Sequence, residues 1–560
     1  MTSGQLQVIT DGTDGVGTWW EQNITFEWSP DSRLLAYALR PRPPAWLGDV
    51  KLTSSEHTAV IVGGPGDSPA SSELFLYDRT TGTTRKVLTR RGARFGDLSW
   101  FPDGRRVVLT ANHAAHEYHD GVLRGEILTL DLITGKELTI ASPGGLQQGL
   151  APVVSPDGRF VAFRYHADSR LYDFTMSVGV VADTGGTIRR LTGPELTVSS
   201  LVGWSADGGR VFFLRPFSPY RQIYSVSVAG TLQQVSAGAR DITGAALSAD
   251  GSLMAWCEVD ARGGKTIVTA SGDGSARRIL VDLAPAVGNL RTGAVEEIQW
   301  LSTDGLEIRG LLILPVGYKA GERYPLVVDV HGGGDGSRIY FGGALLRATA
   351  LEWHLWANLG YAVLVPDYRH SGNYGWRPIL EARDNNRHYD RDFDDIMSGV
   401  DYAIARGIAD SSRLAIIGAS AGAYRVNWAI THTRRFKVAV SYEGWGDEYF
   451  LYGLVPGGNP ILEWENGGLP WDVPQTYIRN SPAFKMKGVT TPTLFIAGGE
   501  TTYGGAVPQY TTYFMNAALQ RQGVETKFVI YRMEGHIVRR PENQRHVVNL
   551  IVDWVDSHLE

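Results

Sequence analysis

Residues 414–430 read LAIIGASAGAYRVNWAI, and this stretch decides the fold of the second half of the chain. The apolar run that opens it predicts a strand buried on both faces of a parallel sheet. The residues from Ala421 onward predict a helix. Between them, Gly418–Gly422 fits G-x-S-x-G, a strained strand-to-helix turn that holds a serine hydroxyl clear of the sheet and leaves no room for bulky neighbours. Ser420 is therefore a candidate nucleophile, and the backbone N–H of Ala421 is a candidate donor to an oxyanion.

Apolar segments alternate with helical ones on both sides of this turn. Helical patterns cover residues 392–405 and 507–522. The apolar segments are nearly continuous, which is typical of a mostly parallel sheet covered by helices on both faces. They begin at Leu306, Tyr324, Tyr361, Leu414, Phe436, Thr491 and Lys527. We therefore expect an α/β-hydrolase domain over residues 288–560.

A glycine loop follows one of the predicted strands upstream of the serine. The strand YPLVVDV ends at His331-Gly332-Gly333-Gly334. In hydrolases of this fold, the corresponding loop supplies the second oxyanion N–H, and glycines let the backbone approach the substrate. Gly332 and Gly333 are the candidates for this role; a plain glycine turn is the alternative.

The general base should lie late in the chain, because the order in this fold is serine, acid, histidine. His536 follows the last predicted strand and precedes the final helix, so it is the candidate base. A carboxylate is expected after the strand TPTLFIAGG, where Glu500 is the only one in the loop. Glu443, at the end of the preceding strand, is the rival. We favour Glu500 and leave open a site without an acid.

The remaining histidines fit a catalytic role less well. His113, His116, His119 and Asp120 match no familiar metal spacing, so we interpret them as a solvated loop. We interpret Arg387 and His388 as surface charge rather than as the lining of a substrate cavity. Four further histidines are expected to be solvated or packing residues: His370, His432, His546 and His558. We expect no metal and no cofactor.

The first half of the chain repeats one phrase. FEWSPDSRLLAY at Phe26 returns as LSWFPDGRRVVL, VVSPDGRFVAF, GWSADGGRVFF and ALSADGSLMAW. Each copy is a strand, a tight turn and a second strand, because Asp and Gly tolerate the backbone angles of such turns. Two hairpins per repeat make a four-stranded blade, and the spacing of about 40 to 70 residues suits a β-propeller. We expect five legible blades within residues 1–287, with a sixth or seventh left open; a β-sandwich is the alternative.

Composition excludes several classes of protein. A chain of 560 residues needs at least two domains. The net charge of −6 comes with no basic stripe, so we expect no nucleic-acid partner. No apolar run approaches the roughly 20 residues that span a bilayer, and the start of the chain lacks the apolar core of a signal peptide. With a single cysteine, Cys257, the expected location is the cytoplasm. A homo-oligomer is left open.

With Ser420, His331 and His536 in place, the chain resembles the prolyl oligopeptidase family of serine peptidases, most closely its acylaminoacyl-peptidase and dipeptidyl-peptidase branch. The stretches that carry the resemblance are GYAVLVPDYRHSGNYGW, NWAITHTRRFKVAVS, TPTLFI and EGHIVRRPENQRH. The resemblance implies that Ser420 is the nucleophile, that His536 is the base and that the His331 loop contributes to the oxyanion hole. It also implies hydrolysis of peptide or amide bonds in short peptides, with the propeller as a size filter.

Four features depart from the family pattern. Thr501 or Thr502 stands where an aspartate is usual, and Ala421 stands where an aromatic residue is frequent. The loop His-Gly-Gly-Gly is closer to esterase usage than the family's His-Gly-Gly-Pro. The only adjacent glutamate pair, Glu296-Glu297, lies in the connector rather than in the propeller, so dipeptide release is not supported.

The leading hypothesis is an acyl-enzyme peptidase or amidase that acts on small peptide or amide substrates. An esterase, lactonase or acyl-transferase with the same triad is the alternative. A binding protein with a decayed site is a third hypothesis, motivated by the missing aspartate.

Overall fold

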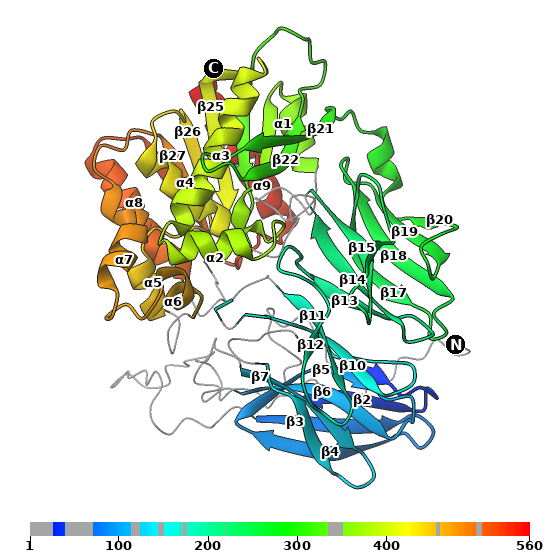
Figure 1. Cartoon of the computed structure of the whole chain (residues 1–560). Helices are drawn as coiled ribbons and strands as arrows, with labels where there is room; N and C mark the ends of the chain where they lie inside the picture. Colours follow the sequence, from blue (N-terminus) through cyan, green and yellow to red (C-terminus); the bar gives the residue numbers. More distant parts are fainter. Residues whose placement is uncertain are drawn as a thin grey trace.

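The computed structural model describes residues 26–39, 71–113, 124–143, 150–168, 170–171, 176–217, 219–333, 351–454, 460–499 and 507–560. These residues form five four-stranded antiparallel sheets and, after them, one eight-stranded sheet with helices on both faces (Figure 1). The chain is thus an N-terminal β-propeller followed by an α/β-hydrolase domain, as the sequence predicts. The segment Met1–Glu21 lies outside the described residues.

The five sheets follow one another along the chain, and each is one blade. The strands of the first two blades are β1 Phe26–Trp28, β2 Leu34–Leu39, β3 Ser71–Asp78, β4 Thr83–Arg91, β5 Ala93–Trp100, β6 Arg106–His113, β7 Arg124–Asp131 and β8 Glu137–Ala141. The other three blades comprise β9 Val153–Val154, β10 Phe160–Tyr165, β11 Ser177–Ala182, β12 Arg189–Arg190, β13 Ser200–Trp204, β14 Arg210–Phe217, β15 Tyr220–Ser227, β16 Leu232–Gln234, β17 Arg240–Leu247, β18 Leu253–Asp260, β19 Lys265–Ser271 and β20 Arg278–Asp282. Neighbouring blades share their hydrophobic clusters, so blade packs on blade.

The repeated turn phrase has a structural reason. In the third blade, the Ser155 hydroxyl donates to Asp157 Oδ1 at 2.7 Å and accepts the Phe160 N–H at 3.0 Å. The same pair of bonds recurs in three other blades, at Ser29, Ser205 and Ser248. The second blade has buried Phe101 in place of the serine. The side chains therefore close the turn and satisfy the first N–H of the following strand.

The hydrolase sheet has the strand order β21-β22-β24-β23-β25-β26-β27-β28. Its first two strands pair antiparallel with their neighbours, and the others are parallel. The strands are β21 Val295–Leu301, β22 Glu307–Ile313, β23 Tyr324–Val330, β24 Ala362–Asp367, β25 Ala409–Ala419, β26 Val438–Tyr442, β27 Thr493–Gly498 and β28 Thr526–Tyr531. The helices are α1 Leu351–Asn358, α2 Arg377–Asp384, α3 His388–Ala405, α4 Ala421–His432, α5 Glu448–Leu454, α6 Pro460–Asn466, α7 Pro474–Asn480, α8 Val507–Arg521 and α9 Pro541–Leu559.

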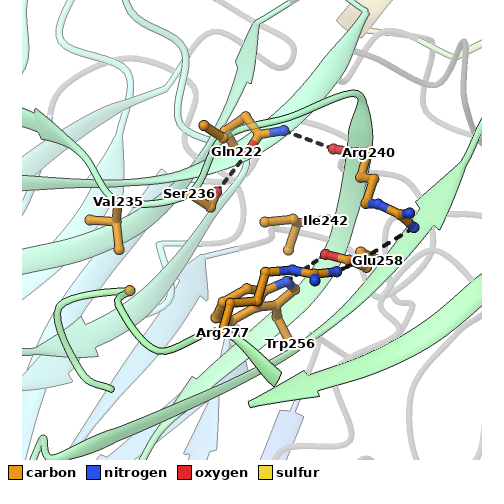
Figure 2. A pocket seen from close by; sticks show the side chains of 10 residues that line it. Gln222, Val235, Ser236, Arg240, Ile242, Trp256, Glu258 and Arg277 are labelled. Carbon is orange, nitrogen blue, oxygen red and sulfur yellow. Dashed lines mark hydrogen bonds and ion pairs between the residues drawn. The ribbon is translucent and has the colours of Figure 1, made fainter. Parts of the chain in front are cut away.

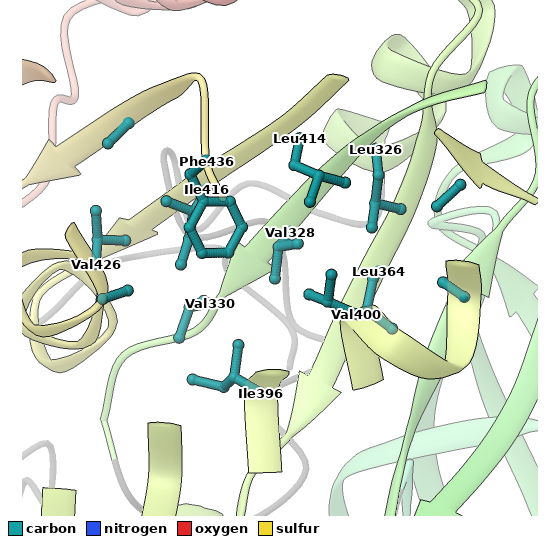
Figure 3. Packing of buried hydrophobic residues seen from close by; sticks show 14 of the residues in the cluster. Leu326, Val328, Val330, Leu364, Ile396, Val400, Leu414, Ile416, Val426 and Phe436 are labelled. Atoms are coloured by element: carbon teal, nitrogen blue, oxygen red, sulfur yellow. The ribbon is translucent and has the colours of Figure 1, made fainter. Parts of the chain in front are cut away.

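Both faces of this sheet are covered. One face packs against α1 and α9 through residues such as Trp353 and Trp554. On the other face, Ile396 and Val400 of α3 and Val426 of α4 pack on the strands, as Figure 3 shows. The central strands are consequently buried along their length, which explains their continuous apolar sequence.

Most of the predicted elements of this domain are present, and the structure adds others. The strand β21 has no counterpart among the predicted strands, because its mixed sequence VEEIQWL contains no continuous apolar run. The helices α5, α6 and α7 lie between β26 and β27, and each is only seven residues long. Helices this short show too little periodicity to be recognised in sequence. Among the described residues, no helix combines the length and the apolar character needed to cross a membrane.

Loops of the propeller contact the hydrolase domain at one edge of its sheet. The Thr197 hydroxyl donates to the carbonyl of Gly372, which follows the carboxyl end of β24, at 2.5 Å. The N–H of Trp376 donates to Pro194 O at 3.0 Å. Leu171 of the propeller joins a small buried cluster with residues of α2 and α6. The propeller therefore lies against the edge at which the parallel strands end.

We predict that Ser155→Ala lowers the free energy of unfolding by about 1–2 kcal/mol, because it removes two hydrogen bonds and leaves a strand N–H without its acceptor. Urea denaturation measures the change. Ser252→Ala is the matched control, since this exposed hydroxyl only donates to Asp250. An equal shift in both variants would contradict the proposed role of the buried serine.

Candidate active site

The candidate residues come together because the parallel strands end in register. Val330 of β23 pairs with Gly418 of β25. Ala419 pairs in turn with Tyr442 of β26. His331, Ser420 and Glu443 each come directly after one of these strands, so they lie at the same edge of the sheet. This edge is where open α/β sheets place their ligands.

Ser420 occupies a strained backbone conformation. Its φ is 56° and its ψ is −126°, outside the regions that non-glycine residues usually adopt. Its N–H donates to Tyr442 O at 2.9 Å, and its carbonyl accepts the Tyr424 N–H of α4 at 3.0 Å. Such a conformation costs about 1–3 kcal/mol and is kept where the surroundings enforce it. The strain agrees with the G-x-S-x-G interpretation of the sequence.

Close backbone approach enforces this turn. A Cβ atom at Gly422 would lie 2.0 Å from Val330 O and 2.7 Å from His331 O. A Cβ atom at Gly332 would lie 2.4 Å from Ala419 O and 2.9 Å from the Ser420 Cβ. Only glycine fits at either position. The start of α4 therefore presses against the end of β23, and the glycine loop presses against the end of β25, which carries Ser420.

The glycine loop is held by the residue before it. The His331 ring stacks on Tyr368, with ring centres 4.6 Å apart, and its Nε2 lies 2.8 Å from Ser371 Oγ. The Tyr368 hydroxyl donates to the His331 carbonyl at 2.9 Å. Gly333 has a φ of 74°, which favours glycine. Gly334 lies outside the described residues.

His536 lies beside Glu443. Its Nδ1 is 3.2 Å from Glu443 Oε2, while Glu443 Oε1 accepts the Gly498 N–H. Glu443 is buried, and its φ of 55° is unusual for a residue with a side chain. The Tyr442 hydroxyl donates to His536 O at 3.3 Å and accepts the Val538 N–H at 3.1 Å. Tyr442 thus connects the turn of Ser420 to the loop of His536. Glu500 lies outside the described residues.

The residues behind this edge include charged groups that the sequence analysis did not single out, Asp392 and Arg425. The expectation of surface charge holds for exposed Arg387 but was wrong for His388, which is 4% exposed. His370, expected to be solvated or packed, is also buried. Burial lowers the pKa of His370 to about 4, although the carboxylate of Asp392 acts in the opposite direction.

Within the described ranges, one group of side chains has the spacing of a metal site. His370, His388 and Asp392 place a ligand atom each within 4.8 Å of one another. Both carboxylate oxygens of Asp392 already have partners, His370 Nδ1 and the guanidinium of Arg425. Of the earlier cluster of histidines, His113 pairs with Glu126 at 2.9 Å, and His116, His119 and Asp120 lie outside the described residues.

A small cavity of about 70 Å³ lies between the fourth and fifth blades (Figure 2). The Glu258 carboxylate in its wall bonds to Trp256 Nε1 at 3.0 Å and to Arg277. Gln222 donates to Arg240 O and accepts from the Ser236 hydroxyl. These polar groups satisfy one another, and none of the lining residues belongs to the hydrolase domain. The cavity is a packing feature of the propeller.

Comparison with known proteins identifies relatives of the chain. A family model described as the prolyl oligopeptidase family matches residues 347–560. An uncharacterized peptidase of Bacillus subtilis, YuxL, is 30% identical over 268 residues, which make up 47% of this chain and 39% of that protein. Dipeptidyl-peptidase 5 of Porphyromonas gingivalis is 23% identical over 473 residues, 83% of this chain and 67% of that protein.

Two solved structures show the same fold. Dipeptidyl peptidase 4 of Porphyromonas gingivalis has a TM-score of 0.69 at 17% identity, with 99% of this chain and 78% of that chain covered. An acylaminoacyl peptidase of Pyrococcus horikoshii has a TM-score of 0.58 at 20% identity, with 94% of each chain covered. The two structures show the fold, and the match to the family model leads to one conclusion: residues 347–560, the larger part of the hydrolase domain, belong to the prolyl oligopeptidase family.

Proposed function

We propose that this chain is a serine peptidase or amidase that cleaves small substrates through an acyl-enzyme on Ser420. The observation that carries the proposal is the pairing of two features at one sheet edge. Ser420 lies on a strained turn, and its N–H bonds to Tyr442 O at 2.9 Å. The next residue, Glu443, bonds to the His536 ring. A serine on a strained turn and a histidine bonded to a carboxylate, both at one sheet edge, support the nucleophile, base and acid that acyl transfer requires.

The chemistry then proceeds in two halves. Ser420 Oγ attacks the substrate carbonyl carbon while His536 Nε2 takes the hydroxyl proton. The N–H of Ala421 and that of Gly332 or Gly333 donate to the oxyanion. The tetrahedral adduct breaks its C–N bond, and His536 returns the proton to the departing amine. A water molecule, deprotonated by His536, then releases the acid and restores the serine.

We assign the acid role to Glu443, although its position in the sequence favours Glu500. A carboxylate bonded to Nδ1 fixes the histidine tautomer that leaves Nε2 free to accept a proton, and it stabilises the imidazolium. Glu443 is buried, and the Gly498 N–H holds its second oxygen. Both contacts support this assignment.

Small peptides are the proposed substrate class. The contacts between propeller loops and the sheet edge support restricted access to Ser420. Relatives named as dipeptidyl peptidases and an acylaminoacyl peptidase support action on short chains. The match spans only 39% of YuxL and 67% of the Porphyromonas dipeptidyl-peptidase 5. The activity of the longer relatives therefore does not stand in for that of this chain, and the tests below use this chain itself.

The first test is active-site labelling. A fluorophosphonate probe should label Ser420 in the wild-type protein, and Ser420→Ala should abolish both labelling and the hydrolysis of peptide p-nitroanilides, because no other group supplies the nucleophile. Mass spectrometry of the labelled peptide identifies the site. Turnover that persists in Ser420→Ala would refute the proposal.

The second test compares the two candidate acids. Glu443→Gln should lower kcat by about 10²–10⁴-fold, because a neutral amide neither fixes the tautomer nor stabilises the imidazolium. Glu500→Gln is the matched control and should stay within about twofold of wild type. Steady-state kinetics on one p-nitroanilide substrate measures both. The opposite ranking would assign the acid role to Glu500.

The third test concerns the glycine loop. Gly332→Ala should lower kcat by about 100-fold, because the new methyl group displaces the loop from Ala419 and misplaces the oxyanion donors. Gly288→Ala is the control, since a Cβ atom there meets nothing within 4 Å. Equal activity of the two variants would contradict the close approach of the loop to the nucleophile.

A further inference from the structure

A buried arginine lies directly behind the nucleophile turn. Arg425 lies one helical turn after Ala421 on α4 and is only 7% exposed. Its Nη1 donates to the Ala421 carbonyl at 3.1 Å. Its Nε and Nη2 donate to Asp392 Oδ2 of α3 at 3.0 and 2.7 Å. One guanidinium therefore joins the start of α4 to α3, through the residue whose N–H is the proposed oxyanion donor.

The same guanidinium contacts the segment that holds the glycine loop. Its carbon lies 5.0 Å from the centre of the Tyr368 ring and 5.6 Å from that of Tyr389. Tyr368 is the residue that stacks on the His331 ring and donates to the His331 carbonyl. A cation held over an aromatic face resists displacement of the ring. Arg425 thus reaches the glycine loop through one intermediate side chain.

A second connection runs through Asp392. The other oxygen of this carboxylate, Oδ1, lies 2.5 Å from His370 Nδ1. The residue after His370 is Ser371, whose hydroxyl lies 2.8 Å from His331 Nε2. Asp392 is fully buried, and the neighbouring positive groups hold its pKa below the usual range despite burial. The ionised aspartate therefore holds both Arg425 of α4 and His370, the residue before Ser371.

The geometry of His370, His388 and Asp392 fits a shared metal ion less well than it fits pairing of Asp392 with Arg425. The rings of His370 and His388 have centres 3.4 Å apart, whereas two zinc-bound imidazoles with Zn–N bonds of about 2.1 Å hold their ring centres roughly 5 Å apart. Arg425 also places a permanent positive charge on the carboxylate that would bind the ion.

We propose that Arg425 is a positioning residue for the hydrolysis proposed above: paired with Asp392, it keeps the N–H of Ala421 and the His331 glycine loop directed at one oxyanion. It touches neither the substrate nor the reacting atoms. The two donors come from segments almost 90 positions apart in the sequence, so their relative placement depends on side chains that contact both. The inference rests on the proposed function and adds a residue to it.

The test is a double substitution that leaves no unpaired buried charge. Removing one partner alone would strand the other in the interior. Arg425→Met/Asp392→Asn removes both charges and keeps similar volumes. Its matched control is Arg435→Met/Asp401→Asn, a second Arg–Asp pair between the α4 region and α3, with a 2.6 Å contact but with side chains 34% and 64% exposed. Melting temperature is measured for each variant.

Two kinetic readouts separate positioning from general loss of structure. The probes are p-nitrophenyl acetate for turnover and phenylboronic acid as a mimic of the tetrahedral adduct. In the Arg425/Asp392 variant, kcat should fall by about 10- to 100-fold with KM within about threefold, because donors that are displaced weaken the transition state rather than substrate binding. The inhibition constant of phenylboronic acid should rise in parallel. The control should match wild type.

Arg425→Lys gives an independent measurement if the double variant does not fold. A lysine keeps the charge but cannot hold both Asp392 and the Ala421 carbonyl, since it lacks the planar fork of donors. We expect a loss in kcat of about 5- to 10-fold with a matching loss of boronate affinity. Unchanged kcat and boronate affinity in a folded variant would overturn the inference, as would one equivalent of bound zinc in the purified wild-type protein.

Failure of this inference is distinguishable from failure of the proposed function. A wild-type protein that fluorophosphonate does not label at Ser420 refutes the proposed function, and the positioning role falls with it. A wild-type protein that is labelled and active, beside an Arg425/Asp392 variant with normal kinetics, refutes the positioning role alone.

Discussion

The contacts on which the site depends are the approach of the α4 start to the end of β23 and that of the glycine loop to the end of β25. At Gly422 and Gly332, backbone atoms of neighbouring segments occupy the space in which a side chain would begin. This packing holds Ser420 at a positive φ. The local strain is small beside the burial of the strands that enforce it, since each fully buried Val, Leu or Ile contributes about 1.5–3 kcal/mol. The apolar core thus stabilises a conformation that the serine alone would not adopt.

Charge is distributed along the same edge in pairs. Asp395 of α3 accepts from Arg369 at 2.6 Å and from the Ser302 hydroxyl at 2.5 Å, and burial raises its pKa to about 6 although Arg369 opposes the shift. Glu443 is likewise buried, with the Gly498 N–H on one oxygen and the His536 ring on the other. Buried carboxylates are tolerated only with partners of this kind. The carboxyl edge of the sheet is therefore polar yet ordered, as a preorganised site requires.

The sequence predicts the parts of this structure that depend on short-range patterns. Continuous apolar runs predict the parallel strands, the recurring Asp turns predict the blades, and GASAG predicts the turn at Ser420. The identity of the carboxylate beside His536 depends instead on the register between neighbouring strands. Glu443 follows β26, and Tyr442 pairs with Ile496 of β27, which brings the glutamate beside Gly498 and the loop after β28. Sequence spacing favours Glu500, because it says nothing about this lateral alignment.

The buried charged residues behind the Ser420 turn could not be predicted from the sequence, for a related reason. The start of α3 reads HYDRDFDD, which suggests a solvated surface, yet His388 and Asp392 are buried because their partners come from distant segments. Arg425, the partner of Asp392, belongs to α4. Glu465, whose Oε1 lies 3.5 Å from His388 Nε2, belongs to α6. A charge can be buried only when such partners are already in place. Formation of the carboxyl edge of the sheet therefore requires α3, α4 and the segments after β26 to assemble together, which couples the geometry of the candidate site to completion of the whole domain.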